Sequence, residues 1–211
     1  YAPIVAWYAS NRVLPVIRLI RQMSSLPISI DTTKAAVAAA ALAEGADLVN
    51  DISALRQDPA MLEVVRSCQG PVIIMHMQGT PGTMQIDPQY ADVVAEISGF
   101  FRDRLQWLEE RGVARNRVIL DPGIGFGKTV AQNFALLARQ NELLQAGYPL
   151  LAGWSRKSTL GTVTGRPVGE RLAGSLAAAL LALQAGATIL RVHDVCETRD
   201  ALAVVQALGK A

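Results

Sequence analysis

Cysteine is nearly absent from this chain, which has two cysteines in 211 residues. Cys68 and Cys196 stand far apart, and neither has a neighbour at the spacing of a zinc site or a redox pair. This scarcity favours a reducing compartment and thiols that are buried or inert. No set of Ser, His and Asp suggests an acyl-transfer triad either.

A strong charge of one sign and a long apolar run are missing too. The net charge is +2, and Lys and Arg neither form a block nor alternate with aromatic residues. A surface for nucleic acid is therefore not expected, whereas a small anion needs only two or three well-placed cations. No apolar stretch has the length of a membrane span, and the N-terminus does not have the pattern of a signal peptide. We expect a cytoplasmic protein that binds neither nucleic acid nor membranes.

What the chain does have is six short apolar runs that each end in polar or charged residues. Half of the residues are hydrophobic (51%), enough for one core in a single domain over residues 1–211. Continuous Val, Ile and Leu runs between helical segments are typical of parallel strands covered by helices. Chemistry at the carboxyl ends of such strands is typical of a (β/α)8 barrel enzyme. The runs end at Asp31, at Asn50 and Asp51, at His76, at Asp121, at Ser155–Lys157, and at Arg191 and His193.

The number of strands falls short of a closed barrel, which needs eight. Residues 1–10 can supply at most one short strand. The fold class predicted is therefore α/β, a (β/α)8 TIM barrel whose first two strands and their loops are missing or incomplete in the printed sequence. We expect the first helix over residues 11–23, with a broad apolar surface that covers the sheet. Further helices are predicted over 34–44, 60–67, 90–111, 130–145 and 168–184.

The densest motif is DPGIGFGK at residues 121–128. Its alternating glycines let the backbone turn sharply and approach a ligand, and Asp121 offers two acceptor oxygens. The spacing fits neither a P-loop nor a dinucleotide fingerprint. A tight turn between strand and helix is the alternative, but it does not explain why Asp, Phe and Lys accompany the glycines.

Two later strand ends carry cations. Lys157, in the motif SRKS, is costly to bury unless it meets an anion or a ligand rich in carbonyl groups, with solvent exposure as the alternative. Arg191 and His193, in RVHD, point to the same side of the last strand. An arginine beside an imidazole suits phosphate or pyrophosphate. His76, between two methionines, is more typical of a core or supporting position.

In this order, the motifs IDT (30–32), VNDI (49–52), MHMQG (75–79), DPGIGFGK, SRKS and RVHD closely resemble the dihydropteroate synthase family. The resemblance runs from about Arg12 to the C-terminus. Asp31, Asn50 and Asp121 are also typical of the wider pterin-binding barrels that transfer methyl groups from methyltetrahydrofolate. SRKS and RVHD favour the synthase branch.

The resemblance implies a transferase of folate biosynthesis, which condenses 6-hydroxymethyl-7,8-dihydropterin pyrophosphate with para-aminobenzoate to give 7,8-dihydropteroate and pyrophosphate. It also implies that sulfonamides compete with aminobenzoate. The catalytic residues implied are Asp31, Lys157, Arg191 and His193. The pterin would contact Asp31, Asn50, Met75, Asp121, Lys157 and Arg191; pyrophosphate would contact Arg191 and His193; and aminobenzoate would contact Gly125, Phe126, Lys157 and Ser158.

The chemistry of these side chains suits those roles. A pterin presents adjacent N–H donors that a carboxylate such as Asp121 accepts in pairs, and Asn50 supplies a donor and an acceptor. Lys157 would donate to the ring, and Arg191 would stack on it. In the family, the bond to pyrophosphate breaks before the amine attacks. Asp31 would then stabilise the cationic pterin.

Two loops of the family do not occur in the printed sequence: an Asn-Val-Thr-Pro-Asp-Ser-Phe-Ser type loop, whose asparagine binds Mg2+, and a Glu-Ser-Thr-Arg-Pro-Gly type loop. We therefore expect Mg2+ as cofactor but no metal ligand among these residues. The alternatives are a non-catalytic pterin-binding paralogue or fragment and, with less support, a methyltransferase with a cobalamin-binding partner. Family members are typically homodimers, and the small-residue segment 170–187 offers a surface for pairing.

Overall fold

The computed structural model describes residues 2–209, which fall into two compact units. The first unit holds the described residues up to His76 and the segment Asp103–Leu120. The second holds Met77–Arg102 and the described residues from Asp121 onward. The single domain over 1–211 stays a prediction, and residues 1, 210 and 211 lie outside the described part.

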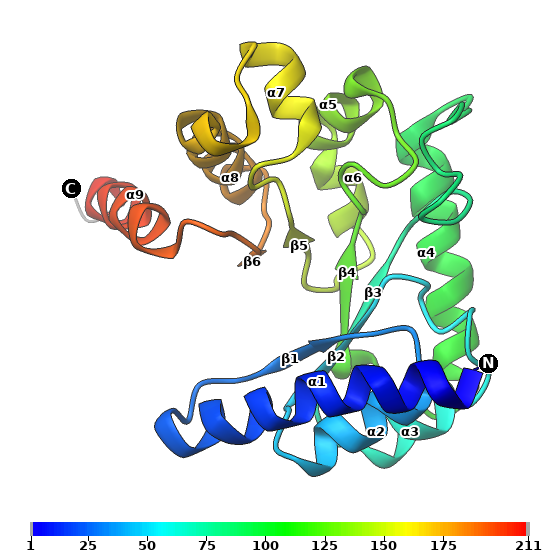
Figure 1. Ribbon diagram of the computed structural model, residues 1–211. Coiled ribbons are helices and arrows are strands. Elements are labelled where there is room, and N and C mark those ends of the chain that lie inside the picture. The colour runs from blue at the N-terminus through cyan, green and yellow to red at the C-terminus, as the bar shows by residue number, and fades with distance from the viewer. Residues whose placement is uncertain (1, 210–211) are drawn as a thin grey trace. The chain divides into compact units, whose positions relative to one another are not determined.

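A four-stranded sheet carries the first unit, and its strands follow the chain in the order β1-β2-β3-β4 (Figure 1). β1 pairs with β2 in parallel, so that Asp31 lies beside Asn50, and β2 pairs with β3 in parallel. Val49 of β2 and the apolar residues of β3 and β4 are almost completely buried, as continuous apolar runs predict. The strands are Ser29–Asp31 (β1), Leu48–Asp51 (β2), Val72–Met75 (β3) and Val118–Asp121 (β4).

The first helix differs from its prediction. α1 spans Ala2–Met23 and therefore begins nine residues earlier than expected, in the segment for which at most a strand was predicted, and Pro15 lies in its interior. Ile17 is buried, but Leu19 is 59% exposed. The prediction that a broad apolar surface of this helix covers the sheet was therefore wrong. α1 packs along α2 (Ala35–Ala43), the helix that follows β1 (Figure 1). Ion pairs from Arg18 and Arg21 hold α1 beside the end of α2, which explains this packing.

The remaining helices of the first unit follow their strands as predicted. α3 (Met61–Ser67) lies between β2 and β3 and packs on α2. α4 (Val93–Glu109) follows β3 and contributes residues to both units, and the 3-10 turn η1 (Arg115–Arg117) precedes β4.

The second unit contains a pair of parallel strands, β5 (Leu151–Ala152) and β6 (Ile189–Leu190). All six predicted strands are thus present in residues 2–209. The predicted helix 130–145 is divided at Arg139, and the helices α7 and α9 were not predicted. The same unit also contains α5 (Val130–Ala138), α6 (Gln140–Leu144), α7 (Ser158–Thr164), η2 (Val168–Glu170), α8 (Leu172–Gln184) and α9 (Val195–Leu208).

Within the described residues, no helix combines the length and the apolar character needed to cross a membrane.

Candidate functional site

Three predicted site residues of the first unit are the last or the last but one residue of neighbouring strands. Asp31 ends β1 beside Asn50 of β2, and Met75 ends β3 and is fully buried. Asn50 is 4% exposed, and its Oδ1 is buried without a hydrogen-bond partner in residues 2–209. An amide oxygen in that state is available to a donor from a ligand.

Asp51, which follows Asn50, is hydrogen-bonded within its own turn. Its carboxylate accepts hydrogen bonds from the backbone N–H groups of Ser53 (2.7 Å) and Leu55 (3.1 Å) and from the Ser53 hydroxyl (2.7 Å). Burial raises the pKa of Asp51, and these donors oppose that effect. The carboxylate therefore shapes the turn after β2.

The DPGIGFGK motif forms a tight loop at the end of β4, and hydrogen bonds among its own residues stabilise it. Asp121 Oδ1 accepts the backbone N–H of Gly123 at 2.8 Å, and Gly123, Gly125 and Gly127 all have positive φ. Lys128 is 3% exposed, and its Nζ donates to the carbonyl oxygens of Gly123 and Phe126, both at 2.9 Å. Burial lowers the pKa of Lys128 to about 7, although the charge of Asp121 opposes the change.

The loop is also stabilised by a buried asparagine side chain of the following helix. Asn133, in α5, accepts the Gly125 N–H at its Oδ1 (2.9 Å). Its Nδ2 donates to the Thr129 carbonyl (2.9 Å) and to the Thr159 hydroxyl (3.1 Å). Thr129 begins α5 with a capping box, so the turn from loop to helix is well defined. These bonds position Gly125 and its neighbour Phe126.

Arg191 contacts the carboxylate at the start of the loop. Its Nη2 lies 2.9 Å from Asp121 Oδ2, as an ion pair without the alignment of a hydrogen bond. Asp121 is fully buried, whereas the Arg191 side chain is 40% exposed. Gly153 makes this contact possible, because a Cβ there would lie 2.7 Å from Nη2. Asp121 Oδ2 therefore has no directed hydrogen bond within the described chain.

Lys157 lies against the glycine loop. Its Nζ is 4.3 Å from the centre of the Phe126 ring, a cation–π distance, and its side chain packs against Gly125. Burial, and then the charge of Arg191, lower the pKa of Lys157. The structure thus brings together three of the four residues predicted for aminobenzoate. The fourth, Ser158, is exposed and begins α7.

His193 lies just beyond the end of β6 and is exposed. Its Nδ1 is 2.9 Å from the Ser155 hydroxyl, which also accepts the His193 backbone N–H at 3.2 Å. The following residue, Asp194, forms an ion pair with Arg156 at 2.5 Å. The other histidine, His76, is buried in the first unit.

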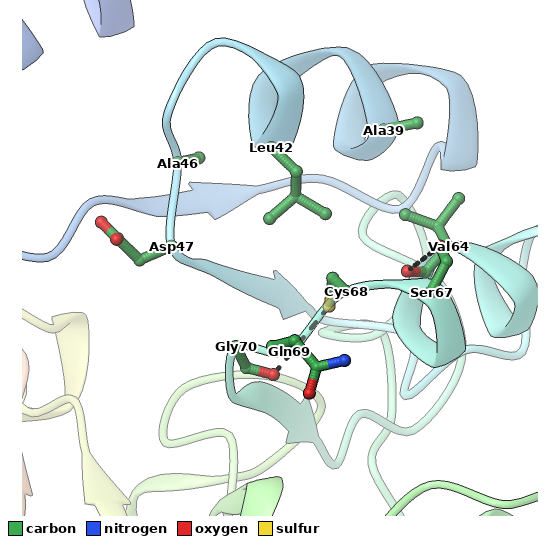
Figure 2. Close-up of a pocket in the computed structure, with 9 residues that line it drawn as sticks. All are labelled: Ala39, Leu42, Ala46, Asp47, Val64, Ser67, Cys68, Gln69 and Gly70. Atoms are coloured by element: carbon green, nitrogen blue, oxygen red, sulfur yellow. Dashed lines mark hydrogen bonds between the residues drawn. The ribbon is translucent and has the colours of Figure 1, made fainter.

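A pocket of the first unit lies at the opposite ends of its strands. Asp47 immediately precedes β2, and Gly70 lies just before β3 (Figure 2). None of the predicted site residues lines this pocket. Its lining consists of Ala39, Leu42, Ala46, Asp47, Val64, Ser67, Cys68, Gln69 and Gly70.

Metal binding has no visible basis among the described residues. In residues 2–209, no three His, Cys, Asp or Glu side chains come together so that they could hold a metal ion. The Mg2+ cofactor, whose ligand is expected outside these residues, therefore stays a prediction.

Comparison with known proteins decides the family. The sequence model of the pterin binding enzyme family matches residues 5–193. Dihydropteroate synthase of Haemophilus influenzae is 47% identical over 201 residues, which cover 95% of this chain and 73% of that protein. The Escherichia coli K12 enzyme is 45% identical, over 93% of this chain and 70% of its own length. The chain belongs to the dihydropteroate synthase family.

Solved dihydropteroate synthases confirm the predicted α/β fold of the (β/α)8 barrel class. The Stenotrophomonas maltophilia enzyme, with imidazole bound in its active site, has a TM-score of 0.92 at 50% identity; the match covers 94% of this chain and 75% of that one. The Yersinia pestis enzyme in a sulfonamide complex has a TM-score of 0.92 at 42% identity, over 95% and 73%. The membership makes this chain a transferase of folate biosynthesis.

Some residues of the candidate site carry little signal in the sequence. In the sequence, Lys128 stands out only as part of its motif, and Ser155 only as part of a strand end. Asn133 gave no signal, because its importance depends on contacts with Gly125 and Thr159 that only the folded chain creates.

Proposed function

We propose that this chain condenses 6-hydroxymethyl-7,8-dihydropterin pyrophosphate with para-aminobenzoate, and that Asp121, Lys157 and Arg191 are central to its site. The observation that carries the proposal is the buried Asp121 carboxylate. One of its oxygens has no directed hydrogen bond, and Arg191 lies beside it. A buried acceptor of this kind is suited to the N–H edge of a pterin.

The pterin contacts follow from this acceptor. Asp121 accepts ligand N–H groups, and Lys157 donates to the ring carbonyl or a ring nitrogen. The buried, unpartnered Oδ1 of Asn50 supports a further ligand hydrogen bond, and Met75 supplies an apolar contact. The lowered pKa of Lys157 supports a role in which it binds a ligand in a partly desolvated place.

The residues proposed to contact pyrophosphate are Arg191 and His193. In the proposed reaction, the bond between the pterin methylene and the pyrophosphate oxygen breaks, and its electron pair leaves with pyrophosphate. Arg191 and His193 stabilise that leaving group, and Asp31 stabilises the cationic pterin. The amine of aminobenzoate then forms the new C–N bond and loses a proton to solvent.

The aminobenzoate contacts are Gly125, Phe126, Lys157 and Ser158. The packing of Lys157 on Phe126 and Gly125 supports this assignment. The Xanthomonas albilineans enzyme has been solved with 4-aminobenzoic acid, and the Yersinia pestis enzyme with a sulfonamide. We expect sulfonamides to compete with aminobenzoate here too.

A homodimer is part of the proposal. Large apolar side chains are exposed on the segment from α7 to α8 of the second unit, and a paired copy would cover them. Light scattering across a range of protein concentrations tests the pairing. The exposed residues are Val163, Val168, Leu172 and Leu181.

Mg2+ and a cytoplasmic location stay predictions from the sequence. Assays with added Mg2+ and with a chelator measure the dependence directly.

Pyrophosphate release, measured with both substrates, tests the function. Lys157→Ala should weaken binding of pterin and aminobenzoate together, because Nζ lies 4.3 Å from the centre of the Phe126 ring and the charges of Arg191 and Asp121 both act on it. His193→Ala should weaken binding of the pterin pyrophosphate but not of its pyrophosphate-free alcohol. Arg199→Ala, at an exposed position of α9, is the matched control.

The outcomes separate the candidate functions. Pterin binding without aminobenzoate-dependent pyrophosphate release would favour the non-catalytic pterin-binding protein. An equal loss of affinity for pterin pyrophosphate and alcohol in His193→Ala would show that the anion assignment is wrong.

A further inference from the structure

The carboxyl ends of β5 and β6 bring a serine and a histidine together. The strands are parallel, with Ala152 opposite Leu190, and the Arg191 N–H donates to the Ala152 carbonyl at 3.0 Å. Ser155 and His193 each lie three residues beyond this matched pair. The register therefore places the two side chains at the same level, although 38 residues separate them in the sequence.

The Ser155 hydroxyl has two partners on the same histidine. It accepts the His193 backbone N–H at 3.2 Å and lies 2.9 Å from Nδ1. A hydroxyl has a single hydrogen to donate, and a backbone N–H can only donate. If Nδ1 also carried a hydrogen, Ser155 would accept twice, and its own hydrogen would have no acceptor in this pair. Ser155 is 6% exposed, so an unpaired hydroxyl hydrogen would be costly.

The neighbouring charges do not compete for Nδ1. Asp194 is the acidic residue next to His193, and both of its carboxylate oxygens accept from Arg156, at 2.5 and 3.2 Å. Arg156 thus holds the carboxylate that would otherwise be the strongest acceptor for an imidazole N–H.

We propose that Ser155 is a positioning residue that holds neutral His193 as the tautomer with hydrogen on Nε2. The hydroxyl donates to Nδ1, so the hydrogen of the neutral ring is carried by the nitrogen on the far side. His193 is exposed, and its Nε2–H is therefore presented outward as a donor. With the proposed function, on which this last step rests, the donor meets a pyrophosphate oxygen, which a bare nitrogen lone pair would repel.

Nitrogen NMR of the imidazole rings tests the tautomer without substrate. The chain has two histidines, so uniform labelling of histidine with 15N gives two ring systems, and His193→Gln assigns them. Spectra are recorded on the full chain at a pH where further addition of alkali leaves the ring shifts unchanged, so that the neutral rings are observed. We expect the shift pattern of the Nε2–H form for His193. The Nδ1–H form in the unmutated chain would overturn the proposal.

Two serine variants show whether the hydroxyl is responsible. Ser155→Ala should shift His193 to a mixture of tautomers, while the His76 signals stay in place and report that the fold is intact. Ser155→Thr, which keeps a hydroxyl, should restore the Nε2–H form. A pure Nε2–H form in Ser155→Ala would show that the serine does not select the tautomer.

Kinetics then separate this proposal from the function itself. Ser155→Ala should raise KM for the pterin pyrophosphate by up to about tenfold, the value of one hydrogen bond, and leave KM for aminobenzoate unchanged. A shift in the tautomer without any change in KM would overturn the link to the anion. Absence of all synthase activity in the unmutated chain, with the Nε2–H form present, would instead contradict the proposed function and leave the role of Ser155 standing.

Discussion

Replacing Asp121 by asparagine tests the central acceptor of the proposed pterin site. In the unmutated chain, Oδ1 accepts the Gly123 N–H, and Oδ2 lies 2.9 Å from Arg191 without a directed hydrogen bond. The asparagine oxygen can still accept from Gly123, so the turn should persist. Its NH2 group would then take the place of Oδ2 and present donors where the ligand also presents a donor.

The expected loss can be worked from these contacts. One ligand N–H loses a charged acceptor, and hydrogen bonds to charged groups contribute about 1.5–3 kcal/mol. The Kd for pterin should therefore rise by a factor of about 10 to 150. Lys128 should respond as well, because the Asp121 charge favours its protonated form. Its pKa should fall further when that charge is removed.

Calorimetry with 6-hydroxymethyl-7,8-dihydropterin measures the effect on binding. Asp200→Asn is the matched control, since it makes the same chemical change at an exposed position of α9. Thermal unfolding of both variants shows whether the fold is retained. A change in Kd of less than about twofold, in a folded Asp121→Asn protein, would refute the assignment of Asp121 to the pterin.

Three further changes test the loop and its surroundings. The pKa of Lys128 is lowered from 10.5 to about 7 in the folded chain. Between pH 7 and pH 10.5, the unfolded chain therefore binds a proton that the folded chain lacks. The free energy of unfolding should rise with pH over this range, by up to ~1.4 kcal/mol per pH unit. Urea unfolding across this range should show that rise reduced in Lys128→Met, and an identical slope would contradict the buried state of the lysine. Gly153→Ala should displace Arg191 and raise KM for the pterin pyrophosphate while stability changes little; an unchanged KM would mean that the position of the guanidinium is unimportant. Asn133→Ala should lower the free energy of unfolding by ~2 kcal/mol or more, because Gly125 loses its buried acceptor, and a loss below ~0.5 kcal/mol would count against that role.

Apolar runs and strand ends made much of the architecture predictable. The strand that ends at Asp121 has buried apolar residues before a polar end, and this pattern depends on local sequence alone. α1 was harder, because Pro15 argues against a helix interior. The contacts that hold α1, from Arg18 to Glu44 and from Arg21 to Asp47, join residues 26 positions apart. Periodicity within a segment carries no information on such contacts.

In the candidate site too, local sequence patterns predict some residues, and contacts between distant residues determine the others. Asp121, Lys157 and Arg191 could be named because each is a charged residue at the end of an apolar run. The burial of Lys128 could not be predicted, since it depends on the loop that folds its side chain back onto the Gly123 and Phe126 carbonyls. The pairing of Ser155 with His193 required the register of β5 and β6, which no single-strand pattern contains.

The contacts of Asn133 have a consequence for how resistance to an inhibitor would arise. One side chain joins the loop at Gly125, the start of α5 at Thr129, and α7 at Thr159. Thr159 is buried, so a substitution there could alter the loop without any contact between residue 159 and a ligand. Substitutions that confer sulfonamide resistance would therefore include positions that support the loop through Asn133 as well as positions that contact the drug, and surveys limited to drug-contacting positions would miss them.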